Sequence, residues 1–219
     1  DCAVAEFTCG DDIEHEGYYY STVEIGEQCW FAENCRFLPA VSSGTANSLE
    51  SPHAYVYDYT GSDVGEALTL ENYNTYGALY NFVAVEQWEL CPVGWSVPSD
   101  DQFIQLEISA GLNSEEADST GWRGSQGSDF KSLIWGGTDA LGFGAIPSGY
   151  KNDVSNSQFF NQIDDACYWW TSSPSIIEDS SQGTIEQTAM EHSLFSDQEG
   201  IARVVSNRRH GFSARCVKD

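Results

Sequence analysis

The clearest hydrophobic pattern in the chain follows Ser99, where apolar residues recur at helical spacing. These residues are Phe103, Ile104, Leu106 and Ile108. The spacing predicts an amphipathic helix over residues 99–110, with one face on a core. Ser99 and Gln102 form a capping box at its start, and Gly111 is suited to end it.

A second helix is predicted over residues 76–88, where Leu79 and Phe82 share one helical face. The alanine, glutamine and glutamate residues of this stretch are good helix formers. A short helical turn is predicted to begin at Asn113, with Ser114 as its N-cap. The pattern therefore predicts two main helices and one short turn.

Strand patterns dominate the rest of the chain. The stretch "YYYSTVEIGEQCWF" alternates between apolar and polar residues, and Gly26-Glu27 suits a two-residue hairpin turn. From Gly121 onward the chain is strand-like and punctuated by glycine. Residues 36–70 are rich in serine, glycine, threonine and alanine, which indicates a long surface loop.

These elements predict one α+β domain over residues 17–219, preceded by an acidic arm over residues 1–16. The chain carries 34 acidic and 9 basic residues, a net charge of −25. Nucleic acids and anionic membranes would be repelled, and no apolar run approaches the ~20 residues that cross a bilayer. We therefore expect no nucleic-acid partner and no membrane insertion. The charge serves either solubility or cation binding, for which calcium is the first candidate.

The cysteines indicate the compartment in which the protein folds and works. No pair has C-x-x-C spacing and no histidine lies near one at zinc-site spacing, so a zinc cluster is not indicated. Scattered cysteines in an acidic chain indicate disulfides in an extracellular, oxidising compartment. The number is odd, so at least one is free or bonded to another molecule. The seven are Cys2, Cys9, Cys29, Cys35, Cys91, Cys167 and Cys216.

Six separated phrases occur in a characteristic order: "YYYSTVEIGEQCWFAEN", "YGALYNFVAV", "LCPVGWSVPSDDQFIQL", "GFGAIPSGY", "YWWTSSPS" and "GFSARCVKD". Over about residues 17–219 the chain resembles the Fibrobacter succinogenes major paralogous domain. The resemblance implies a secreted or surface protein with a C-type-lectin-like fold, which has two main helices, a small antiparallel sheet and long glycine-rich loops. It also implies a relationship to the formylglycine-generating sulfatase modifiers. The family's own ligand is largely undefined.

The resemblance further implies a disulfide between Cys91 and Cys216. Lectin-like domains join a cysteine near a helix to one on the last strand, and these two cysteines occupy those positions. In the chain-entropy model, closing a loop of over a hundred residues stabilises the fold by about 4–5 kcal/mol. A second bridge, Cys9–Cys29, is expected because the acidic arm needs an anchor and Cys29 lies just past the predicted hairpin turn.

The remaining cysteines leave a third pairing open. Cys35 replaces the apolar residue that is usual after "AEN" in the family, and Cys167 opens the predicted strand "CYWW". These two residues are candidates for a third bridge. That pairing would leave Cys2 free or joined to another chain.

Polar residues flank the predicted strand that carries Trp169 and Trp170. Adjacent strand residues point to opposite faces, so one tryptophan should enter the core and its neighbour should face outward. An exposed ring beside polar groups suits a sugar or a peptide. The alternative, in which both tryptophans pack under loops and the acids are only solvated, is equally open. The candidate ligand-binding residues are Tyr150, Asn152, Trp169 and Trp170, and the candidate calcium ligands are Asn152, Asp153, Asp164 and Asp165.

The sequence gives little indication of a catalytic site. The sulfatase modifiers use two paired cysteines, and no second cysteine stands beside Cys216. None of the four histidines belongs to a recognised catalytic motif. We therefore expect a non-catalytic extracellular binding or adhesion module whose partner is a polysaccharide or a cell-surface protein. The first alternative is a subunit of a surface fibre that self-associates through Cys2, and a formylglycine-generating-type enzyme is less favoured.

Overall fold

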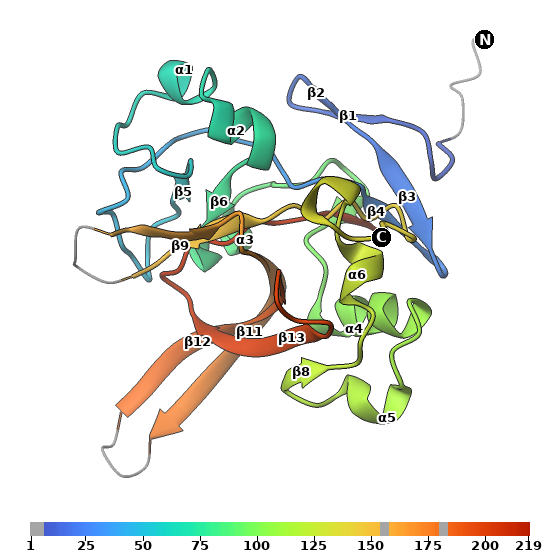
Figure 1. Ribbon diagram of the computed structural model, residues 1–219. Coiled ribbons are helices and arrows are strands. Elements are labelled where there is room, and N and C mark those ends of the chain that lie inside the picture. The colour runs from blue at the N-terminus through green and yellow to red at the C-terminus, as the bar shows by residue number, and fades with distance from the viewer. Residues whose placement is uncertain (1–6, 154–157, 180–183) are drawn as a thin grey trace.

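The computed structural model describes residues 7–153, 158–179 and 184–219 (Figure 1). It has the expected α+β class. The helices are α1 (Val64–Ala67), α2 (Glu71–Tyr76), α3 (Phe82–Gln87), α4 (Asp100–Ser109), α5 (Ser114–Ala117) and α6 (Gly127–Phe130), with the 3-10 helix η1 (Leu133–Trp135). The strands are β1 (Ile13–His15), β2 (Tyr18–Tyr20), β3 (Thr22–Ile25), β4 (Gln28–Phe31), β5 (Ala54–Tyr55), β6 (Leu79–Tyr80), β7 (Trp95–Ser96), β8 (Gly121–Arg123), β9 (Ser148–Lys151), β10 (Phe160–Ile163), β11 (Ala166–Asp179), β12 (Thr184–Phe195), β13 (Ile201–Asn207) and β14 (Val217–Lys218).

The largest sheet has six strands in the order β10-β9-β11-β12-β13-β8. All neighbouring strands are antiparallel except β9 and β11, which are parallel. Strands β11 and β12 form a long hairpin whose far end projects from the body of the molecule (Figure 1). This sheet is therefore the main scaffold on which side chains are displayed.

Helix α4 covers one face of this sheet. Its Phe103 and Leu106 belong to a buried cluster with Trp169 and Leu194 of the sheet. The prediction of a capped helix is confirmed, because the Ser99 side chain accepts a hydrogen bond from the third helical residue and that residue's side chain bonds back to the Ser99 backbone. The amphipathic pattern thus marks the interface of helix and sheet.

His192 lies beneath α4 between two carboxylates and is fully buried. Its Nε2 is 3.0 Å from Asp100 Oδ1, and its Nδ1 is 2.6 Å from Glu107 Oε1. Arg203 pairs with Asp100, and Arg123 with Glu107. A neutral imidazole has one N–H, so the ring donates to both carboxylates only when it is protonated. Burial alone would lower the pKa of His192, but the two carboxylates outweigh burial and raise that pKa above 6.5.

A second sheet joins the two ends of the chain in the order β3-β4-β14-β7. The predicted hairpin is present, with residues 26–27 as its turn. Both expected disulfides, Cys9–Cys29 and Cys91–Cys216, are formed, each with a Cα–Cα distance of 5.8 Å. They anchor the N-terminal segment and tie β14 to the segment before β7.

The prediction of a helix over residues 76–88 is wrong for the first half of this range. Gly77 has a φ of 78°, which ends α2. Strand β6 follows and pairs with β5, and Tyr80 also exchanges backbone hydrogen bonds with Phe212. The helix begins only after Asn81, whose side chain caps it by accepting from a backbone N–H of the first turn. Long-range strand pairing therefore overrides the local helical pattern.

Two smaller expectations also need correction. Asn113, rather than Ser114, caps α5, because its side chain accepts from the Glu115 backbone N–H. The region 36–70 is not only a surface loop, since it contains β5 and α1. Within the described part of residues 1–16, β1 pairs with β2.

The candidate bridge between Cys35 and Cys167 is wrong. Both are buried free cysteines, and they belong to different hydrophobic clusters. The Cys35 Sγ instead lies 3.4 Å from the Sγ of Cys216. Cys2 lies outside the described residues.

The position of His192 predicts a pH-dependent stability. A raised folded-state pKa contributes stability that is present below the ordinary value and is lost as the pH rises through the raised value. Thermal melts between pH 5 and pH 9 should therefore show a fall in Tm above pH 6.5 that is smaller in His192→Gln, whose amide does not titrate. An equal fall in both proteins would contradict a protonated His192.

Candidate ligand-binding surface

The two faces of the six-stranded sheet are covered differently. Directly opposed residues of antiparallel strands share a face. The register aligns Tyr168 with Ser193, and Ser193 with Ala202. It aligns Ala202 in turn with Trp122 on β8. These positions alternate with those that α4 covers, and Trp122 and Val204 are 46% and 37% exposed. The face turned away from α4 is therefore open toward its β8 edge.

Four aromatic side chains form a row on this face. The centroid distances are 5.2 Å from Trp122 to Phe195, 5.6 Å from Phe195 to Tyr168, and 5.0 Å from Tyr168 to Tyr150. They come from β8, β12, β11 and β9, so the row runs across the sheet (Figure 1). Trp122 is exposed and the other three rings are half-buried. We call these four residues the aromatic strip.

Polar side chains lie at the Tyr150 end of the strip. The hydroxyl of Tyr168 donates a hydrogen bond to Gln162 Oε1. His210 packs against Tyr150 at 5.9 Å, and its Nε2 is 3.3 Å from Asp153 Oδ1. The side chains of Tyr150, Asp153, Gln162, Tyr168 and His210 are all half-buried. Aromatic rings and hydrogen-bonding groups thus lie close together at this end of the strip.

A buried carboxyl group lies on the same face. Glu191 is aligned with Trp170 on one side and Val204 on the other, and it is 3% exposed. Burial raises the pKa of Glu191 to about 8. No described residue forms a hydrogen bond with its Oε2. The carboxyl group is therefore protonated at neutral pH and has one oxygen without a protein partner.

The family model of the Fibrobacter succinogenes major domain matches residues 23–218. The chain belongs to this family. No curated protein and no solved structure matches it. The two disulfides of this Fibrobacter succinogenes major domain indicate an extracellular location. Among the described residues, no helix combines the length and the apolar character needed to span a bilayer.

The expectation that one tryptophan of this domain faces outward is wrong. Trp169 and Trp170 are 2% and 0% exposed. The indole N–H of Trp169 donates to the side-chain oxygen of Asn34 at 2.9 Å, and that of Trp170 donates to the Tyr80 carbonyl at 2.7 Å. The ring of Phe212 covers Trp170 at 4.4 Å. Both faces of the sheet are covered at this point, so neither indole meets solvent.

The four candidate calcium ligands fall into two separate pairs. Asn152 and Asp153 follow β9, whereas Asp164 and Asp165 follow β10. The antiparallel register places Asn152 beside Phe159 and Asp164 beside residue 147, at opposite ends of the two strands. The expected four-residue site is therefore not assembled. Calcium binding by the domain stays a prediction, but these four residues do not form one site.

Each of the three carboxylates instead has a protein partner. Asp153 contacts His210, Asp164 accepts a hydrogen bond from Tyr76, and Asp165 accepts one from Ser196. The remaining member, Asn152, is buried and donates its side-chain N–H to the carbonyl of residue 158. Of the candidate binding residues, Tyr150 alone belongs to the aromatic strip.

Sequence reasoning missed three strip residues. Tyr168 could have been found, because alternation along "CYWW" places it on the same face as Trp170. Trp122 follows a glycine on a short strand, and Phe195 ends a strand, so neither lies in a long alternating pattern. Only the pairing of β8, β13 and β12 brings them into line with Tyr168.

Glu191 should make the domain less stable as the pH rises. Its folded-state pKa of about 8 lies above the ordinary 4.5, so the stability that it contributes below pH 4.5 is lost as the pH rises through 8. Glu191→Gln should match wild type at pH 5 and melt higher at pH 9. At about 1.4 kcal/mol per pKa unit, and about 2–4 °C per kcal/mol for a domain of this size, we expect a gain on the order of 10–20 °C.

Glu186→Gln is the matched control, since Glu186 lies on the same strand and is exposed. It should leave the difference between pH 5 and pH 9 as in wild type. A Glu191→Gln protein that melts no higher than wild type at pH 9 would contradict a buried neutral carboxyl group.

Proposed function

We propose that this domain is an extracellular, non-catalytic binding module that holds a neutral polysaccharide against the aromatic strip. The observation that carries the proposal is the row of four partly exposed rings across one face of the sheet, with Trp122 at its exposed end. Partly exposed aromatic rings combine apolar contact area with few rotatable bonds, which makes them effective binding groups.

The chemistry of the strip favours a sugar polymer over a peptide as ligand. A pyranose presents C–H groups on its ring faces and hydroxyl groups around its edge. Rings in a row support the C–H faces of successive sugar units, while polar groups such as Gln162 and His210 bond hydroxyl groups at the edge. A folded protein partner would need a wider apolar surface than this single row.

The net charge of the domain limits which polysaccharides it could bind. A net charge of −25 repels polyanions, including polysaccharides that carry carboxylate or sulfate groups. A neutral glycan meets no such penalty. We therefore propose a neutral polysaccharide of the cell surface or the surroundings as partner.

We propose that the domain is not an enzyme of the formylglycine-generating type. Such chemistry needs two thiols that act together. The two free cysteines among the described residues, Cys35 and Cys167, belong to different hydrophobic clusters. This separation supports a binding role.

A C-type-lectin-like arrangement is part of the proposal. Two features support it. The N-terminal hairpin β3–β4 pairs with the C-terminal strand β14, and the Cys91–Cys216 disulfide closes the domain beside this sheet. In such an arrangement the ends of the chain meet and the long segments between them are free to present a binding surface.

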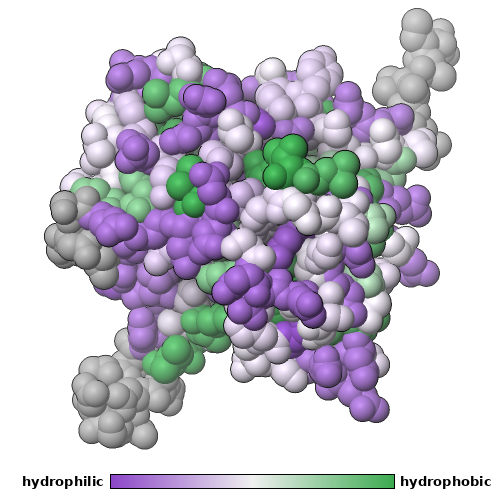
Figure 2. Space-filling view, viewed as in Figure 1, coloured by the Kyte–Doolittle hydropathy of each residue, from purple (hydrophilic) through white to green (hydrophobic). Residues whose placement is uncertain are grey.

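One observation favours a second candidate function, a subunit of a surface fibre. Ile176 and Ile177 are 64% and 45% exposed on the projecting β11–β12 hairpin. Figure 2 shows hydrophobic side chains there, one of several hydrophobic patches on the face in view. Exposed neighbouring isoleucines favour contact with another chain. Self-association through Cys2 would add a covalent link, which a dimer band on non-reducing gels would reveal.

Trp122→Ala tests the polysaccharide proposal. The substitution removes the exposed end of the strip without opening the core, so we expect an unchanged Tm and about tenfold weaker retention by a neutral glucan in affinity electrophoresis. Ile134→Ala is the control, because Ile134 is 87% exposed but lies on η1, outside the strip. Equal retention of wild type and Trp122→Ala, or no binding of wild type to any neutral glycan on an array, would contradict the proposal.

A further inference from the structure

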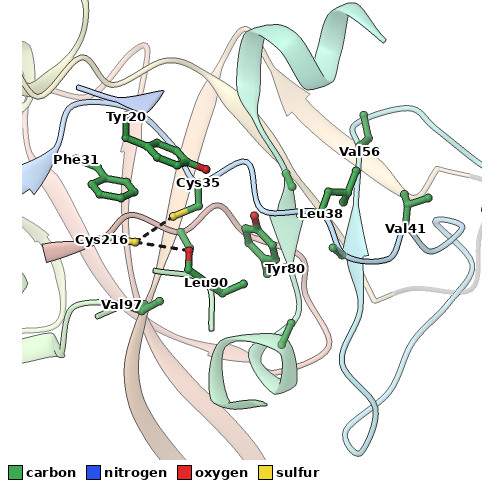
Figure 3. Close-up of a cluster of buried hydrophobic side chains, with 14 of the residues drawn as sticks. Tyr20, Phe31, Cys35, Leu38, Val41, Val56, Tyr80, Leu90, Val97 and Cys216 are labelled. Atoms are coloured by element: carbon green, nitrogen blue, oxygen red, sulfur yellow. Dashed lines mark hydrogen bonds between the residues drawn. The ribbon is translucent and has the colours of Figure 1, made fainter. Parts of the chain in front are cut away.

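A third sulfur lies beside the Cys91–Cys216 disulfide. The Sγ of Cys35 is 3.4 Å from the Sγ of Cys216, and all three sulfurs lie within 4.8 Å of one another. Figure 3 shows the side chains of Cys35 and Cys216 pointing toward each other within the hydrophobic cluster. Cys216 is therefore in contact with two possible partners.

Backbone pairing fixes this arrangement. The Cys35 N–H donates to the Ala214 carbonyl, and the Phe31 N–H donates to the Cys216 carbonyl. The segment after β4 thus runs alongside the segment before β14. On the other side of Cys216, its Sγ is 3.9 Å from the Leu90 carbonyl, next to Cys91. The sulfur of Cys216 is held between the two segments that carry the other cysteines.

We propose that Cys35, Cys91 and Cys216 form a thiol–disulfide exchange site that makes Cys91 a covalent attachment point for a disulfide-bearing molecule. The Cys35 thiol gives its proton to water, and the resulting thiolate attacks the Sγ of Cys216. A Cys35–Cys216 bond forms, the Cys91–Cys216 bond breaks, and Cys91 leaves as a thiolate. Cys91 then attacks the incoming disulfide R–S–S–R, forms Cys91–S–S–R and releases R–S⁻. No net oxidant is needed.

The surroundings of the sulfurs favour Cys91 as the reacting end. Cys35 and Cys216 are both 0% exposed, whereas Cys91 is only half-buried. Cys91 also lines a surface groove of about 440 Å³, together with residues that include Trp88 and Gln102. A molecule in this groove would reach Cys91 but not the two buried cysteines.

Two features keep the resting disulfide at Cys91–Cys216. Exchange proceeds with the three sulfurs in line, which would put Cys35 Sγ more than about 5 Å from Cys91 Sγ, whereas the three sulfurs all lie within 4.8 Å of one another. In addition, burial raises the pKa of Cys35 to about 12. The site therefore exchanges slowly at neutral pH.

The groups around Cys35 act on its thiolate in opposite directions. Arg215 favours the thiolate, while Glu33 disfavours it. The phenols of Tyr20 and Tyr80 also face the thiol, and the pKa of each is raised, mainly by burial, so both stay neutral. Well below pH 12 the thiolate fraction, and with it the exchange rate, should rise about tenfold per pH unit.

The first test labels the native protein with 4,4′-dithiodipyridine at pH 8, quenches with acid and maps the disulfides by peptide mass spectrometry. Wild type and the control Cys167→Ala should gain the label on Cys91 together with a Cys35–Cys216 bond. Cys35→Ala should keep Cys91–Cys216 and take no label on Cys91. Equal labelling of Cys91 in Cys35→Ala, or no labelling of Cys91 in wild type, would overturn the proposal.

The second test does not depend on the groove. In Cys91→Ala, oxidative folding should yield a Cys35–Cys216 disulfide, and the protein should melt higher than Cys35→Ala/Cys91→Ala, which cannot form it. Two free thiols at Cys35 and Cys216 in Cys91→Ala would show that the sulfurs touch but do not exchange.

Discussion

The burial of the C-terminal segment, residues 211–217, is the constraint on which the rest of the domain depends. All seven residues are buried, so their backbone groups need partners inside the protein. These partners come from β9, β6, β11, β4 and the segment that follows β4, so one short segment connects parts that are distant in the sequence. The hydrogen-bonded residues are Lys151, Tyr80, Tyr168, Trp170, Cys35 and Phe31. Cys216 adds the covalent link to the segment before β7.

Burial of this segment also places the charged side chain of Arg215 inside the protein. Its guanidinium is fully buried, and within the described residues it has hydrogen-bond partners but no carboxylate within ion-pair distance. It donates to the Phe143 carbonyl and the Asn34 side chain and stacks 3.8 Å from the centroid of the Phe143 ring. Burial lowers the pKa of Arg215 to about 10. The same segment supports the aromatic strip, because Phe212 stacks on Tyr168 at 5.0 Å. The proposed binding would therefore need little reordering of these rings.

Features fixed by neighbouring residues could be predicted from the sequence. The capping box of Ser99 and the hairpin turn at residues 26–27 are local, and Cys9–Cys29 follows from that hairpin. Apart from the Cys91–Cys216 disulfide, which the family resemblance implied, features fixed by long-range pairing could not be predicted. Tyr80 is a strand residue because it pairs with the C-terminal segment, and Trp170 is buried because that segment covers it. The strip was missed for the same reason, since its four rings come from four strands whose order no local pattern encodes.

Native-state hydrogen exchange tests the central role of the C-terminal segment most directly. If this segment holds the sheets together, the amides of Gly211, Phe212 and Ser213, which donate to the backbone of three different strands, exchange only when the whole domain unfolds. Their exchange free energies should then equal the global free energy of unfolding and match those of amides in the β12–β13 pairing, which does not involve the C-terminal segment. The three amides could instead exchange at a clearly lower free energy while the sheet is still protected. The domain would then stay folded without its C-terminal segment, which would contradict the account.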